Sequence, residues 1–255
     1  MCAMKSRNIK ISTMSAAIIL IAYSCSKNND NTVVSPPVAG SSYLAVTNVS
    51  PTTNTYGVYS DNTNIYSSGT IGYGSSTGVM NGSPYETISD STHSIYLDNN
   101  GVRTNIDSGF AFQNNSYYSL LTYDTGAQMK TLALKDNLTA PASGEAEVRV
   151  LNLSSYGQPL NVWFVNTDTT MKDSVQLANV SYAGAEGVIA DSLGAFKPIA
   201  PGTYKVLFNS TANANLFTRD TLTVAAGGIY TIYSQGYLNG NNGTDSLNLG
   251  VIRNY

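Results

Sequence analysis

The sequence predicts an all-β protein built from two similar domains in series, and three observations support this. Residues 147–154 (EVRVLNLS) match residues 43–50 (YLAVTNVS) at an offset of roughly 104 positions, which indicates a repeated unit. Tyr occurs 18 times, and long runs of Ala, Glu, Lys and Leu are missing. Apolar and polar residues alternate over short runs that end at Asn or Gly, as in half-buried strands joined by tight turns.

The N-terminal segment is predicted to be a lipoprotein signal peptide, residues 1–24. Three basic residues within positions 5–10 precede the apolar run at residues 14–22. That run is too short to cross a bilayer of roughly 30 Å as a helix, but it suits a secretory signal. It closes on Ala22-Tyr23-Ser24-Cys25, which resembles the lipobox of bacterial lipoproteins and makes Cys25 the lipid acceptor. The alternative, a disulfide at Cys25, lacks a partner because Cys2 lies in the discarded segment.

Residues 25–42 are expected to form a lipid-anchored flexible tether. They are rich in Ser, Asn, Thr and Pro, and Pro36-Pro37 interrupts regular structure. Residues 26–30 (SKNND) resemble the start of Bacteroidetes lipoproteins, in which Lys followed by acids directs export to the outer face; Asn28 and Asn29 replace those acids here. We therefore expect an outer-membrane lipoprotein of the cell envelope, exposed at the cell surface, with the membrane as its partner through the lipid.

Strand-like runs then follow in the same order in both copies. Runs at residues 56–59, 92–97 and 117–120 correspond to runs at residues 160–163, 203–208 and 229–232. Asn100-Gly101 predicts a type I′ hairpin turn, because both residues tolerate positive φ. About seven short strands in roughly 100 residues are typical of antiparallel β-sandwiches of immunoglobulin or transthyretin type.

The predicted boundaries follow from this pattern. The first β-sandwich repeat spans residues 43–136 and the second spans residues 145–255. Between them, residues 137–144 form a linker with Pro141 at its middle. Because the offset is near the size of one sandwich, residues 145–255 are expected to fold alone.

A family resemblance rests on strand cores and turns of these repeats. The segments that carry it are residues 148–154, 160–163, 180–182, 200–204 and 225–231. They resemble the domain-of-unknown-function 4397 family (DUF4397), here in two tandem copies, with the second copy matching more fully than the first. The resemblance implies a β-sandwich in a secreted or lipid-anchored protein, and it defines no catalytic or binding residue.

The charge balance argues against nucleic acid as a partner. Removing the signal peptide takes three of the 13 basic residues and leaves ten against 16 acidic ones, a net charge of −6. Phosphate binding needs clustered cations, which this chain lacks.

Catalytic and metal sites are not predicted, and neither is a cofactor. His93 is the only histidine, and it lies mid-strand where the second copy has Tyr204, so we interpret it as filling the strand pattern. The loop from Asp168 to Asp173 lacks the ligand spacing and closing Glu of a Ca²⁺ loop, which favours a solvated hairpin. The glycines of residues 69–74 lead into no helix, so they indicate a loop or bulge and no phosphate site.

The excess of tyrosines is the one feature that suggests a ligand. Tyr56, Tyr59 and Tyr73 are the candidate binding residues, because aromatic rings stack on sugars and anchor protein interfaces. Packing of the sandwich by the same rings is the alternative. We expect a non-enzymatic module for binding glycan or envelope protein, or for adhesion. An architectural spacer is the alternative function, followed by a glycan-degrading enzyme, which would need two opposed acids.

Overall fold

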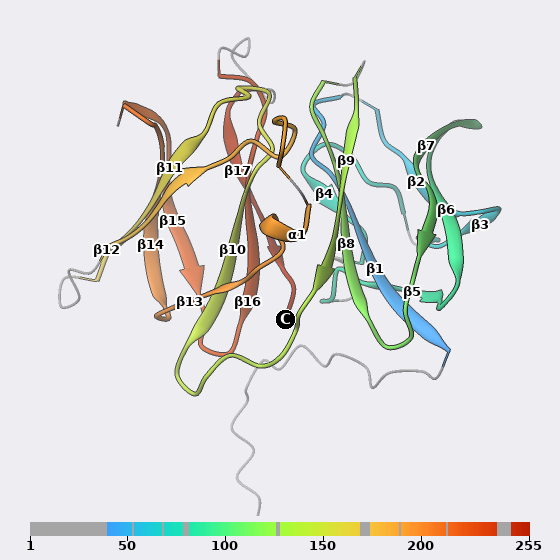
Figure 1. Cartoon of the computed structure of the whole chain (residues 1–255), viewed down its shortest axis with the longest axis horizontal. Coiled ribbons are helices and arrows are strands. Elements are labelled where there is room, and N and C mark those ends of the chain that lie inside the picture. Colours follow the sequence, from blue (N-terminus) through green and yellow to red (C-terminus); the bar gives the residue numbers. More distant parts are fainter. Residues whose placement is uncertain are drawn as a thin grey trace, which may run out of the picture. The chain divides into compact units, whose positions relative to one another are not determined.

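The computed structural model describes residues 40–255 except 53, 68, 79–81, 126–127, 169–173, 189, 213 and 239–245. The predicted signal peptide, Cys25 and most of the tether therefore lie outside the described residues. The described chain contains 17 strands and one short helix, which confirms the all-β prediction (Figure 1).

The first half of the chain, residues 40–136, forms two sheets. Its strands are β1 (Ser41–Asn48), β2 (Gly57–Ser60), β3 (Thr63–Asn64), β4 (Ser75–Ser76), β5 (Glu86–Ser89), β6 (Thr92–Asn99), β7 (Val102–Ala111), β8 (Tyr117–Tyr123) and β9 (Lys130–Asp136). The β1 sheet has the order β4-β1-β8-β9, with β5 also paired to β1, and the β2 sheet has the order β3-β2-β6-β7. Asn100 and Gly101 join β6 to β7 with φ of 53° and 87°, as the type I′ turn prediction requires.

The second half, residues 146–255, repeats this order of strands. Its elements are β10 (Ala146–Asn152), β11 (Leu160–Asn166), β12 (Ser174–Val180), α1 (Ala190–Leu193), β13 (Lys197–Ile199), β14 (Gly202–Ser210), β15 (Asn215–Val224), β16 (Ile229–Gln235) and β17 (Asn248–Arg253). The β10 sheet has the order β13-β10-β16-β17, and the β11 sheet has the order β12-β11-β14-β15.

One strand pair in each half is parallel. The first strand of the half lies beside its penultimate strand in the same direction: β1 beside β8, and β10 beside β16. The prediction of wholly antiparallel sheets is wrong at these two pairs. The paired strands are not joined by a hairpin, and the intervening strands supply the long crossover that a parallel pair needs.

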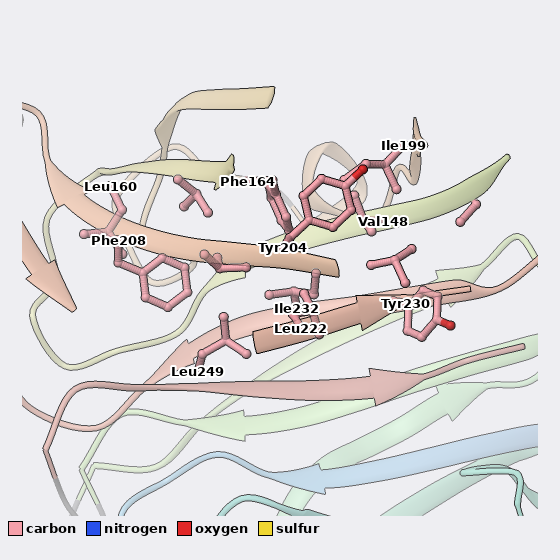
Figure 2. Packing of buried hydrophobic residues seen from close by; sticks show 14 residues of the cluster. Val148, Leu160, Phe164, Ile199, Tyr204, Phe208, Leu222, Tyr230, Ile232 and Leu249 are labelled. Carbon is pink, nitrogen blue, oxygen red and sulfur yellow. The ribbon is translucent and has the colours of Figure 1, made fainter. Parts of the chain in front are cut away.

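Each half encloses a hydrophobic core between its two sheets. In the second half, Val148 and Ile232 of the β10 sheet face Phe164 and Phe208 of the β11 sheet (Figure 2). The core of the first half forms in the same way, for example from Leu44 on β1 and Leu97 on β6. Alternate residues of β14 are buried, because successive side chains of a strand point to opposite faces.

A third core joins the halves. It contains Val49, Leu121, Tyr123, Leu132 and Leu134 of the first half, together with Leu151, Leu153, Tyr182, Tyr233 and Ile252 of the second. These side chains come mainly from the β1 and β10 sheets, on the faces turned away from each half's own core. Both sheets are thus covered on both faces, and every residue of β16 is buried. The two halves therefore pack directly against each other.

Close packing in this third core explains a glycine. Gly250 on β17 lies opposite Tyr233 on β16, and a Cβ at position 250 would come within 2.1 Å of the Tyr233 ring. Tyr233 has 1% of its surface exposed, so the ring has no room to move away. Burial raises the pKa of Tyr233, and this phenol stays neutral at physiological pH.

Candidate functional site

The three tyrosines singled out from the sequence lie in three different environments. Tyr56 belongs to the core of the first half, with 7% of its surface exposed, so it fills the packing role. Tyr59 lies on the outward face of β2, because the neighbouring Val58 points into the core. Tyr73 is half-buried, and the adjacent Gly74 lies against Gln235 of the second half. Only Tyr59 therefore lies on a solvent-facing sheet surface.

The Tyr59 ring lies next to Gly57 and Arg103. Its ring lies over Gly57, where a Cβ would come within 3.2 Å of the ring. The guanidinium of Arg103, on β7, lies 4.4 Å from the ring centroid, a cation–π arrangement that stabilises the pair by about 0.5–1 kcal/mol at an exposed site. The Nε of Arg103 lies 3.5 Å from Oδ2 of Asp98. Arg103 thus crosses the outward face of the β2 sheet in a defined position.

A surface pocket of about 380 Å³ lies at this arginine. We call it the Arg103 pocket, and its lining residues are Asp61, Asn62, Tyr96 and Arg103. Nη1 of Arg103 donates to the backbone oxygen of Asp61 at 3.2 Å and to Oδ1 of Asn62 at 3.3 Å. These bonds tie the turn after β2 to the far edge of the sheet, so the pocket is largely pre-formed.

The chemistry of the pocket is mixed. Arg103 and the Asn62 amide supply donors, and the Asp61 carboxylate supplies acceptors. A hydrogen bond from the Ser94 backbone N–H and one from His93 lower the pKa of Asp61, so its carboxylate is ionised at neutral pH. Donors and acceptors beside aromatic rings suit a ligand that carries many hydroxyl groups. Asp61 and Asp98 offset the charge of Arg103, so the site is not specialised for anions.

The structure gathers a second group of polar side chains around the only histidine. Oδ2 of Asp61 lies 2.7 Å from Nδ1 of His93, and Nε2 of His93 lies 2.8 Å from the Oγ atoms of both Ser89 and Ser91. We call these four residues the His93 cluster. The interpretation of His93 as a residue that only fills the strand pattern missed these contacts. Asp61 is 32 residues away in the sequence, and no local pattern links it to His93.

An ion pair without solvent exposure lies between the two halves. Nη1 of Arg149, on β10, donates to Oδ1 of Asp136, at the end of β9, over 2.7 Å, and both side chains are 0% exposed. Nη2 of Arg149 also donates to Oγ1 of Thr231 at 2.8 Å. The Phe196 ring covers the guanidinium at 4.4 Å from its centroid. Buried charges persist only when they are paired and hydrogen-bonded in this way.

Further hydrogen bonds close this ion pair into a ring, which we call the interface network. Tyr85 donates to Oδ2 of Asp136 at 2.7 Å and accepts from Nδ2 of Asn254 at 2.8 Å. Thr231 donates to Oδ1 of Asn254 at 2.7 Å, which completes the path back to Arg149. Burial and the Asp136 charge raise the pKa of Tyr85 well above its usual value, so its hydroxyl remains a donor. The network's role is structural, since its charged members are inaccessible.

The structure describes parts of two other segments that the sequence singles out. Asp168 is described and its backbone N–H bonds to Oδ1 of Asn166 at 2.8 Å, but Asp173 lies outside the described residues. Within residues 69–74, Ile71 forms a β-bridge with Tyr56, so this segment is a structured loop. Among the described residues no three His, Cys, Asp or Glu side chains gather to hold a metal ion. None of the described helices is long and apolar enough to cross a membrane.

Comparison with known proteins identifies a family. Residues 42–163 match the model of the family described as "Domain of unknown function (DUF4397)", so the match runs through the first half and ends in β11. The motifs of the sequence resemblance are fuller in the second copy, whereas the family match lies mainly on the first. No curated protein matches the sequence.

Similarity to solved structures is low. The Bacillus anthracis TIE protein is 12% identical over 76% of this chain and 33% of its own, with a TM-score of 0.22. A leucine-rich repeat protein from Bacteroides thetaiotaomicron VPI-5482 is 12% identical over 76% of this chain and 25% of its own, with a TM-score of 0.21. The chain thus spans only a third and a quarter of these two proteins. Residues 42–163, a little under half of the chain, thus match the DUF4397 family.

Proposed function

We propose that this protein is an outer-membrane lipoprotein of the cell envelope whose surface-exposed β-sandwiches bind glycan without cleaving it. The observation that carries the proposal is the Arg103 pocket, with Tyr59 held beneath its arginine on a solvent-facing sheet. The shared strand order of the two halves supports two tandem copies of one immunoglobulin- or transthyretin-like domain. In such an arrangement one copy can carry a site while the other keeps the plain scaffold.

Comparison of the two copies supports the first half as the binder. The sheet position of Tyr59 is occupied in the second half by Trp163, which pairs with Leu207 and Gln176. In the first half Tyr59 pairs with Tyr96 and stacks on Arg103. The first of these two faces combines aromatic rings with an arginine, a carboxylate and an amide, the groups that hydrogen-bond sugar hydroxyls.

The binding proposal is tested with the full chain on an array of polysaccharides and oligosaccharides. Affinity for one site is expected between about millimolar and micromolar, with many tethered copies supplying avidity. Arg103→Ala should weaken binding about tenfold or more, because it removes the donors and frees the Tyr59 ring. Arg253→Ala changes an exposed arginine of the second half and should have no effect. Tyr56→Ala is unsuitable as a probe, since Tyr56 supports the core.

Two results would count against a glycan-binding pocket. If Arg103→Ala binds as well as the unchanged chain, the ligand lies elsewhere. If the unchanged chain binds no glycan, the architectural spacer becomes the better function. The third core and the interface network favour that second candidate, because they make the two halves one stiff unit.

Anchoring at the membrane is tested separately through Cys25. Cys25→Ser removes the thiol that would carry the diacylglycerol, so the protein is expected to stay unprocessed or to leave the membrane fraction. Cell fractionation and mass spectrometry of the N-terminus measure both outcomes. A variant that keeps its full N-terminal segment and still partitions as the unchanged protein does would refute the lipoprotein assignment.

A further inference from the structure

The contacts of the His93 cluster follow the order carboxylate, imidazole, hydroxyl. Asp61 accepts from Nδ1 of His93, which leaves Nε2 as the acceptor for a serine hydroxyl. The Asp61 carboxylate is itself fixed, because its Oδ1 accepts from the Ser94 backbone N–H at 2.9 Å. The backbone of Asp61 has a φ of 50°, the left-handed conformation that Asp tolerates in the tight turn between β2 and β3.

The side chains of the His93 cluster differ in their exposure to solvent. The His93 side chain is 13% exposed and its ring lies 5.9 Å from that of Phe112, so the imidazole is held in place. Ser89 and Ser91 are both exposed at the turn between β5 and β6. A fixed base thus faces hydroxyl groups that solvent molecules and substrates can reach.

Folding of this turn does not require the cluster. In the second half the matching turn joins β13 to β14, and the residue matching His93 is Tyr204. The Tyr204 hydroxyl closes that turn by donating to the backbone oxygen of Ala200 at 2.6 Å. The same scaffold therefore forms its turn with no serine, histidine or aspartate at these places.

We propose that the His93 cluster is a nucleophilic site at which Ser89 or Ser91 attacks small carboxylic esters. His93 is the general base, and Asp61 is a positioning residue that holds the imidazole. This activity goes beyond glycan binding. Asp61 belongs to both the Arg103 pocket and the His93 cluster, but the serine chemistry requires no glycan in the pocket.

The reaction balances with water as the only co-reactant. The serine Oγ forms a bond to the ester carbonyl carbon, and its proton passes to Nε2 of His93. The bond to the leaving alkoxide breaks, and the alkoxide takes that proton and departs as an alcohol. Water then attacks the acyl-serine with His93 again as base, which releases the carboxylic acid and restores the hydroxyl.

The expected rate of ester hydrolysis follows from the catalytic groups that the His93 cluster supplies. General-base assistance contributes about 10²–10⁴-fold to a rate. General-base assistance is the one catalytic contribution that the contacts of the His93 cluster assign. Turnover is therefore expected to be slow, and covalent labelling of the serine is the more sensitive readout.

The test exposes the full chain to a fluorophosphonate probe and follows the adduct by intact mass and peptide mapping. We expect one adduct, on Ser89 or Ser91, and slow hydrolysis of p-nitrophenyl acetate. His93→Gln should slow labelling about 10²-fold, because the serine loses its base. The double change Ser89→Ala and Ser91→Ala should abolish it. Ser174→Ala, at an exposed serine of β12, is the matched control and should label normally.

Asp61→Asn examines the positioning role. Asn can still accept from Ser94, so the turn should keep its structure and melting temperature. Labelling should slow, and its dependence on pH should change, because Asn cannot stabilise the imidazolium. The proposal is overturned if no adduct forms, if it forms on another residue, or if His93→Gln labels at the unchanged rate.

Discussion

Replacing Arg149 by Met is expected to destabilise the protein by about 3–5 kcal/mol, because the change leaves the Asp136 carboxylate buried without a counter-charge. Asp136 is 0% exposed and lies between the two halves, so water cannot replace the lost guanidinium without opening the interface. For a fold of this size the loss corresponds to a fall in melting temperature of about 6–20 °C. Thermal and urea denaturation followed by circular dichroism measure the change.

Two further variants separate this effect from the loss of a large side chain. Arg253→Met changes an exposed arginine and should alter stability by no more than about 0.5 kcal/mol. The double variant Arg149→Met with Asp136→Asn removes both charges. It keeps an acceptor for the hydroxyls of Tyr85 and Ser119, which donate to Oδ2 of Asp136 at 2.7 and 2.6 Å. It should recover a large part of the lost stability, since the buried charge is gone. Equal stability of Arg149→Met and the unchanged chain would mean that solvent reaches the interface network.

Separating the two halves is expected to have the second large effect. Residues 145–255 expressed alone would expose Leu151, Leu153, Tyr182, Tyr233 and Ile252, and would leave Arg149 without Asp136. We expect this fragment to aggregate, or to melt more than about 10 °C below the full chain. Adding a fragment of residues 40–136 should restore a soluble complex, because the halves present matching apolar faces.

Size-exclusion chromatography and thermal melts of each fragment, alone and mixed, provide the measurement. A monomeric second half that melts cooperatively at the temperature of the full chain would show that the third core contributes little. Independent folding is what the sequence repeat suggested. The shared third core leads us to expect the opposite outcome in this experiment, because the outward faces of the β1 and β10 sheets are apolar and cover each other.

The sequence contained part of the candidate site. Tyr59 follows from the excess of tyrosines, and it does lie on a solvent-facing sheet. Tyr56 lies three positions before Tyr59 in the same segment, but its side chain points into the core. A count of tyrosines cannot reveal this difference. Arg103 and the His93 cluster come from separate turns and strands, so no spacing in the sequence connects them.

One member of the interface network could be suspected from the sequence. Arg149 lies between Val148 and Val150 and is buried, and a buried charge is retained only where a partner is buried with it. The partner, Asp136, is the last residue of the preceding strand, β9, and an acidic residue at a strand end gives no indication of a buried ion pair. Asp136 and Arg149 are 13 residues apart in the sequence, and only the folded chain shows that their side chains meet across the interface.

The sequence by itself determined the all-β class, the succession of strands along the chain and the hairpin at Asn100-Gly101. Alternation and turn residues act over a few neighbouring positions, so these features can be predicted locally. Tertiary structure decided the parallel pairing of β1 with β8 and of β10 with β16, the third core, and both polar clusters around Asp61. These features depend on contacts between segments far apart in the chain. Strand patterns set which face of a strand is apolar, but which surface covers that face depends on how the sheets pack.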